Sequence, residues 1–295
     1  MIGAEHQSSW GWLTAADFFF GGTGASLFLV SLILKIYGFY GNLLESGFLI
    51  GLVFVIIGLA CLTKHIWTRR GKFLGVLSRP NTSWISRGSI FNIAFLVFGI
   101  LYIAPQWLGW IPWTQDSTLG VGIGAAAGIT AFLIVLYPGM LLQSLNSIPF
   151  WNSPIMPLIF ISYGLTGAIG ILSITLPVLT ASFTAVPKSL MLWQMILLGW
   201  TTALLAMQLI AASSSRRESK ESVTELTRGR LFGVFVVGTL VVGLIIPLIV
   251  SAFSYATDDF VLPAISGVLV LIGSMLNRYT FLSAGIYVEL RPLVQ

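Results

Sequence analysis

The sequence predicts an all-helical integral membrane protein with eight transmembrane helices, arranged as two parallel four-helix bundles. The first observation behind this prediction is composition. Of the 295 residues, 56% are hydrophobic and 8% are charged, and the mean hydropathy is +0.94, whereas a soluble domain is about 25% charged. The second is a series of eight apolar segments of the length that a bilayer-spanning helix needs, roughly 20 residues. This composition excludes a soluble globular protein, a disordered chain and a nucleic-acid binder.

The predicted spans follow one another with short connections. They lie at about 13–37, 44–63, 88–108, 119–145, 155–178, 188–212, 230–254 and 261–286. Connections this short leave no room for an extramembrane domain. If the protein takes part in redox or hydrolytic chemistry, much of that machinery would belong to a partner.

An even number of spans puts both termini on one side of the membrane, and the basic residues gather on that side. It holds twelve lysines and arginines, the opposite side holds Lys35 and Lys188, and Arg278 lies within the last span. The positive-inside rule then places the termini in the cytoplasm. The same charges would equally suit an acidic partner, and that alternative stays open. We predict a multi-pass protein of a prokaryotic cytoplasmic membrane.

A short repeated motif indicates internal duplication. The pattern [ST]-R-G-x-[IL]-F occurs at 86–91 and again at 227–232, which is 141 residues later, and each copy opens the third helix of its half. This predicts an N-terminal half, 1–150, that carries the site and a C-terminal half, 151–295, related by an axis along the membrane normal. The same offset pairs Tyr137 with Arg278 at equal depth. A match this short also arises by chance.

Metal chemistry has few ligands to draw on. Two haems would need four axial ligands, and the chain has two histidines, His6 in the N-terminal tail and His65 at the end of the second span. One cysteine, Cys61, excludes a Cys-ligated zinc or iron–sulfur site built by this chain alone. We expect no haem and no metal in the chain.

Polar residues near one face of the membrane favour a quinone site. A quinone needs an apolar slot, donors for its two carbonyls and two protons for its reduction. The candidates for that chemistry are Asp17, His65 and Tyr137, and the candidates for substrate binding are Arg87, Arg278 and Asn277. All lie in the half of the membrane that faces the termini. Ionisable residues inside a membrane are costly and are functional by default.

Each candidate also has a structural interpretation. Asp17 could cap its helix or pair with a base, His65 and Tyr137 could be interfacial residues, Arg87 could anchor topology or bind lipid phosphate, and Arg278 could pair with Glu289. The fifth to seventh spans hold no acid or histidine, so a relay of such groups across the bilayer is not visible and active proton pumping is disfavoured.

Four stretches of the sequence resemble the NrfD/polysulfide-reductase family of membrane subunits. They are Lys64-His65 with the later Thr-Ser-Trp-Ile-Ser-Arg-Gly run at 82–88, Phe-Phe-Gly-Gly-Thr-Gly-Ala at 19–25, Tyr-Pro-Gly-Met-Leu-Leu at 137–142, and Pro-Phe-Trp-Asn-Ser-Pro-Ile-Met-Pro-Leu-Ile-Phe at 149–160. The 82–88 run is the most specific of them. Together they cover most of the first five spans, while the last three spans match in general character.

The resemblance implies a haem-free membrane anchor that exchanges electrons between the quinone pool, menaquinone or ubiquinone, and an iron–sulfur subunit. That subunit usually sits beside a molybdopterin catalytic subunit, most often outside the cytoplasm. By position, the residues that line the quinone pocket fall on Asp17 and Tyr137, and His65 is also implicated. The basic loops would form the docking surface, with Arg69, Arg70, Lys72, Arg79, Arg216 and Arg217.

Two other classes of function remain open. A small-molecule transporter with parallel repeats would use Arg278 and Asp17 near the midplane, and a purely structural anchor would bind only lipid in its pocket. A transporter should show a polar path that reaches both faces. The sequence places its polar residues on one side, which favours the hypothesis of a quinone site.

Overall fold

The structure is a computed structural model that describes residues 5–39, 41–70, 81, 83–179, 188–257, 259 and 261–288, without the side chains of 68–70 and 176–179. The described residues are helical almost throughout. The helices are α1 Trp12–Ile36, α2 Asn42–Arg70, α4 Trp84–Trp107, α5 Thr118–Gln143, α6 Ile155–Leu179, α7 Lys188–Ser213, α8 Arg217–Thr227, the π-helix η1 Gly233–Ile245, α9 Ile246–Thr257 and α10 Leu262–Ser283.

The described residues contain eight helices long and apolar enough to span a membrane, as predicted, with η1 and α9 forming one continuous span, Gly233–Thr257. Span boundaries agree with the predicted ones to within a few residues. Two features were not predicted. One is α8, a short charged helix outside the spans, and the other is the π-helical first half of the seventh span.

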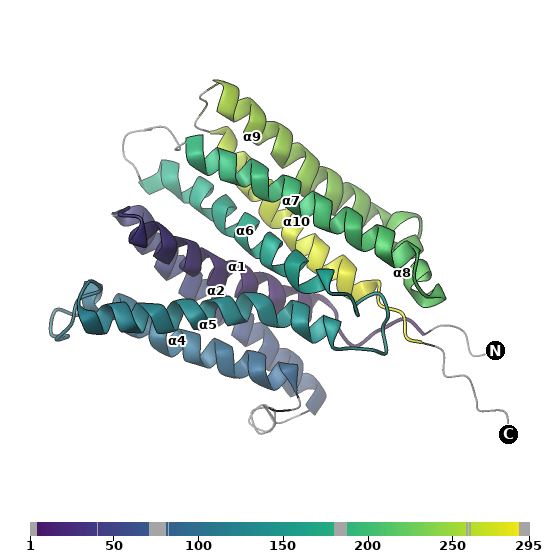
Figure 1. Cartoon of the computed structure of the whole chain (residues 1–295), viewed down its shortest axis with the longest axis horizontal. Helices are drawn as coiled ribbons and strands as arrows, with labels where there is room; N and C mark the ends of the chain where they lie inside the picture. The colour runs from purple at the N-terminus through teal and green to yellow at the C-terminus, as the bar shows by residue number, and fades with distance from the viewer. Residues whose placement is uncertain are drawn as a thin grey trace.

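Two groups of helices lie side by side in Figure 1, α1, α2, α4 and α5 in one and α6, α7, α9 and α10 in the other. Equivalent pairs pack in both groups: α1 on α2 as α6 on α7, α4 on α5 as α9 on α10, and α1 on α5 as α6 on α10. Across the middle, α1 packs on α6 and on α10. This is the pattern that two related halves would give, and the division at residue 150 stays a prediction.

The two copies of the repeated motif lie in different local structures. Gly88 is in the second turn of α4, whereas Gly229 is in the turn after α8, where an added Cβ would meet the backbone of Glu225 at 2.7 Å. The motif itself therefore carries no common structural role. The predicted equal depth of Tyr137 and Arg278 is supported better, because both reach α1, at consecutive residues.

Small residues bring the central helices into contact. A Cβ on Gly58 of α2 would lie 2.8 Å from the backbone nitrogen of Gly21 in α1, and a Cβ on Gly267 of α10 would lie 2.4 Å from the carbonyl oxygen of Gly170 in α6. Apolar side chains give little driving force between helices in lipid, so close backbone packing at such residues holds the bundle together.

The first and last described segments, 5–7 and 285–287, lie together at one end of the bundle (Figure 1), which is the arrangement an even number of spans gives. His6 forms an antiparallel bridge with Ile286, and the Tyr287 amide donates to the carbonyl of Glu5 at 3.0 Å. Beneath this seam Trp151 stacks on Trp10 and donates its indole N–H to the carbonyl of Phe281 at 2.8 Å. We call this end of the bundle the terminal end.

Candidate functional site

Asp17 and Tyr137 form a buried pair near the terminal end. The Tyr137 hydroxyl donates to Oδ2 of Asp17 at 2.9 Å, and the two residues are 1% and 3% exposed. Asp17 is five residues from the start of α1 and Tyr137 six residues from the end of α5, which is about 8–9 Å along each helix. Two residues that the sequence predicted for one site are therefore in direct contact.

Glycines let three helices close around this pair. A Cβ on Gly88 of α4 would lie 2.5 Å from Cε2 of Tyr137, so only glycine leaves the phenol ring this position. On α2, Gly58 packs against the backbone of Asp17. On α5, two residues after Tyr137, a Cβ on Gly139 would lie 2.3 Å from Cα of Pro157 in α6. The ring edge also contacts Phe18, with centroids 6.1 Å apart. The pair is thus held by α1, α2, α4 and α5 together.

Arg278 reaches α1 from the other half of the molecule. Its Nε donates to the carbonyl of Phe18 at 3.0 Å, and its Nη1 donates to the carbonyl and the hydroxyl of Ser274. The guanidinium is 1% exposed and sits among the rings of Phe19, Phe160 and Tyr163. Among the described residues, no direct ion pair joins it to Asp17.

Several polar atoms around Arg278 have no hydrogen-bond partner within the described part of the chain. They are Nη2 of Arg278, Nδ2 of Asn277 and the hydroxyl of Tyr163, all buried. Asn277 is next to Arg278 in sequence, and no hydrogen bond joins its side-chain nitrogen to the Asp17–Tyr137 pair. Arg278 and Asn277 thus lie in the second half, close to the pair and not part of it.

His65 and Arg87 lie closer to the terminal surface. His65 is half-buried and comes two turns after Gly58 on the same side of α2, about 10 Å further along that helix. Arg87 is turned toward the start of α4, where Nη2 donates to the carbonyl of Asn81 at 2.9 Å and the guanidinium lies 4.6 Å from the ring of Trp84. These contacts hold Arg87 at the N-terminal end of α4.

The predicted docking residues fall into two groups. Arg216 and Arg217 are exposed at the start of α8, and Arg217 pairs with Glu221 at 2.8 Å. Arg69 and Arg70 end α2, but their side chains lie outside what the structure describes, and so do Lys72 and Arg79 altogether. On α8 the face opposite the charges packs inward through Ser219, Ser222 and Leu226.

One expectation was wrong: polar side chains are not confined to the half of the membrane near the termini. In the far half, Gln194 of α7 donates to Ser266 at 3.0 Å and accepts from Ser173 at 3.2 Å, and Ser266 bonds Ser251 at 2.8 Å. Deeper in the bundle, Thr201 bonds Ser162. The prediction considered acids and histidines. It overlooked the hydroxyl and amide side chains within the apolar runs.

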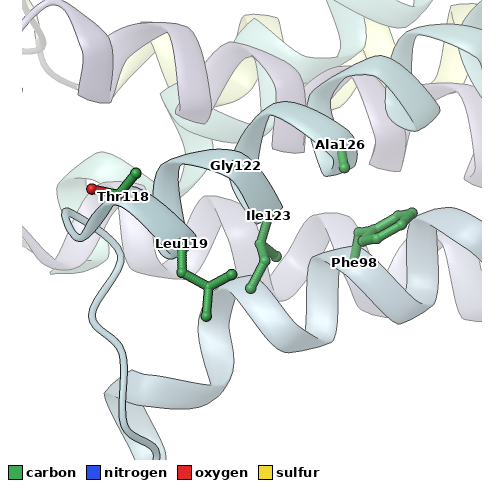
Figure 2. A pocket seen from close by; sticks show the side chains of 6 residues that line it. All are labelled: Phe98, Thr118, Leu119, Gly122, Ile123 and Ala126. Atoms are coloured by element: carbon green, nitrogen blue, oxygen red, sulfur yellow. The ribbon is translucent and has the colours of Figure 1, made fainter.

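Two shallow grooves mark the outer surface of the bundle. One, of about 560 Å³, lies between α4 and the start of α5, and Figure 2 shows Phe98, Leu119 and Ile123 pointing into it. The other, of about 700 Å³, runs along the α2 face from Ile56 to Trp67. Both are apolar and suit lipid chains. In the described part of the chain, no three of His, Cys, Asp and Glu gather to hold a metal ion.

Three residues near the Asp17–Tyr137 pair were not predicted from the sequence as site residues. Gly88 stood in the quoted motif, but its contact with Tyr137 could not be read from spacing. Asn92, one turn further along α4, and Thr14, one turn before Asp17, are buried and each has an unpartnered oxygen. A polar residue within an apolar run was the signal that would have found Asn92.

The fold and the site define a multi-pass membrane protein with a buried carboxyl–phenol pair near one end of its bundle. Residues 1–289 match the family described as "Polysulphide reductase, NrfD", and the chain belongs to this family. It is also similar to Protein NrfD of Escherichia coli (strain K12), with 26% identity over 191 residues, which is 57% of this chain and 60% of that protein. The match thus spans less than two thirds of the relative's length. Family membership confirms the resemblance found in the sequence.

Proposed function

We propose that this chain is the quinone-interacting membrane subunit of a multi-subunit oxidoreductase, and that the Asp17–Tyr137 pair is its quinone site. The single observation that carries the proposal is the direct bond between these two buried side chains at 2.9 Å. An acid and a phenol buried at the same depth, among apolar helices, supply what quinone chemistry requires. Membership of the NrfD family supports the same function.

The chemistry is a two-electron, two-proton exchange. A quinone takes up two electrons and two protons to become a quinol, and the reverse step releases them. In this proposal a quinone oxygen takes the place of Asp17 as the acceptor of the Tyr137 hydroxyl. Asp17 gives or takes the two protons one after the other, and His65 exchanges them with the terminal surface. The quinone is menaquinone or ubiquinone.

An iron–sulfur subunit would exchange the electrons at the terminal end. Asp17 lies about 8 Å from the start of α1, so a cluster docked over that end comes close to the quinone. Arg216 and Arg217 are exposed there and belong to the docking surface, with a molybdopterin catalytic subunit beyond. We place the protein in a prokaryotic cytoplasmic membrane, with the termini inside by charge bias.

The test begins with the protein as it occurs in native membranes. It is purified in gentle detergent, co-purifying chains are identified by mass spectrometry and bound quinone is extracted. We expect an iron–sulfur chain and quinone. Asp17→Asn and Tyr137→Phe should each lower bound quinone, whereas Tyr255→Phe, at the far end of α9, should not. A protein that purifies alone and free of quinone, under conditions that keep respiratory complexes intact, would overturn the proposal.

A transporter is the second candidate, because the Ser173–Gln194–Ser266–Ser251 network carries polar groups into the far half of the membrane. A transporter would use this network and Arg278 together. Gln194→Leu should then abolish uptake of the transported small molecule in whole cells and leave bound quinone unchanged. The quinone function predicts that the same variant affects stability only.

A further inference from the structure

Asn92 is a buried amide with one unused acceptor. It lies in α4 and is 1% exposed, and its Nδ2 donates to the carbonyl of Gly88 at 2.8 Å. The Oδ1 atom has no hydrogen-bond partner among the described residues. Because the carbonyl of Gly88 can only accept, the nitrogen has to face it, and this fixes the oxygen on the other side of the amide.

This amide lies one helical turn from Gly88, the residue that faces the ring of Tyr137. Gly88, to which Asn92 bonds, is the residue whose Cα faces the Tyr137 ring, with Cε2, Cδ2 and Cζ 2.5, 2.6 and 2.9 Å from an added Cβ. The four residues thus form a chain of contacts: Asn92 to Gly88, Gly88 to the phenol ring, and the phenol hydroxyl to Asp17. An unpartnered carbonyl oxygen buried in a membrane bundle is costly unless a ligand or water meets it.

The chemistry of this oxygen selects one form of the ligand. An amide oxygen accepts hydrogen bonds and cannot donate them. A quinone presents two carbonyls, which also only accept, whereas a quinol presents two hydroxyls, which donate. A site built to bond a hydroxyl discriminates against an analogue that lacks it.

We propose that Oδ1 of Asn92 accepts a hydrogen bond from a quinol hydroxyl, so that Asn92 makes the site prefer quinol to quinone. This rests on the proposed function and adds a ligand-contacting residue with its own selectivity. Asp17 and Tyr137 serve both forms of the ligand, because a carboxyl and a phenol each donate and accept. Asn92 serves the reduced form alone.

The experiment measures the affinity of the purified full-length protein for menadiol and for menadione, without oxygen, from the quenching of its tryptophan fluorescence. The variants are Asn92→Leu and Asn92→Ala. The matched control is Ser89→Ala, which removes another buried α4 side chain that bonds the carbonyl four residues earlier, here that of Ile85. Two variants of different size keep the test available if one fails to fold.

The lost hydrogen bond should weaken menadiol binding about three- to tenfold in either Asn92 variant, while menadione binding stays within about twofold and Ser89→Ala changes neither. Equal weakening of both ligands, or of neither, would overturn the role of Asn92 and leave the quinone site standing. If the unmodified protein binds neither probe, the proposed function fails and this inference fails with it.

Discussion

Replacing Gly88 with alanine tests how the site is built. The new Cβ would lie 2.5 Å from Cε2 and 2.6 Å from Cδ2 of Tyr137, whereas carbon atoms rest about 3.5–4.0 Å apart. The ring or α4 therefore has to shift by about 1 Å. A shift of that size that moves the hydroxyl away from Asp17 takes their 2.9 Å bond beyond hydrogen-bond distance. Overpacking of this kind costs about 1–3 kcal/mol of unfolding free energy.

The assay compares thermal unfolding and quinone binding of the purified full-length protein. Gly88→Ala should lower Tm and should weaken binding at least as much as Tyr137→Phe. In a Tyr137→Phe background it should still lower Tm but add little to the binding defect, because the bond to Asp17 is already gone.

The matched control is Gly122→Ala, which is also a helical glycine but has open space where its Cβ would go. It should leave quinone binding unchanged and should not lower Tm, because alanine favours a helix more than glycine does. If Gly88→Ala binds quinone and melts like the unmodified protein, the contact between α4 and the Tyr137 ring does not hold the site.

Three further variants test other buried contacts through the unfolding free energy of the purified protein. Arg278→Lys should lower it by about 1–3 kcal/mol, because an ammonium lacks the planar fork that bonds Phe18 and Ser274 together. Trp151→Phe should lower it by about 1 kcal/mol, because the carbonyl of Phe281 loses its indole donor. Gln194→Leu should lower it by about 1–3 kcal/mol, because two buried serines each lose one of their hydrogen-bond partners.

Each of these variants has a surface counterpart. Arg216→Lys, Trp110→Phe and Gln106→Leu change the same residue types at exposed positions, and Trp110 is 78% exposed. They should leave stability unchanged. A buried variant that behaves like its surface counterpart would show that the corresponding contact contributes nothing measurable.

The sequence predicted depth in the membrane well, because depth follows from helix ends. Apolar runs fix where a span begins and ends, and residue counts then place Asp17, Tyr137 and Arg278 near the terminal end. It could not predict which side of a helix faces its neighbours. Spans such as α5 are apolar all round, so no polar face shows the direction of Tyr137. The resemblance to a family supplied that pairing.

Two other features could not be predicted from the sequence, for different physical reasons. An apolar run does not distinguish i→i+4 from i→i+5 bonding, so the π-helical start of the seventh span could not be seen. The segment that forms the short helix α8 was predicted to be a basic docking loop. Its residues Ser219, Ser222 and Leu226 recur at helical spacing and form the inward face of the helix.

The Asp17–Tyr137 pair lies within residues 1–150, the predicted first half, and the second half reaches it through α1. In the part of the chain that the structure describes, Asp17 and Arg278 are the only charged residues that are fully buried. Tyr137 bonds the side chain of Asp17, and Arg278 bonds the carbonyl of Phe18, so the two reach consecutive residues of α1. A shift of α10 would therefore move α1 and, with it, the Asp17 carboxyl. The second half thus contacts α1 through the packing of α6 and α10 and through the hydrogen bond from Arg278. Arg278→Lys should weaken quinone binding even though Arg278 bonds neither Asp17 nor Tyr137.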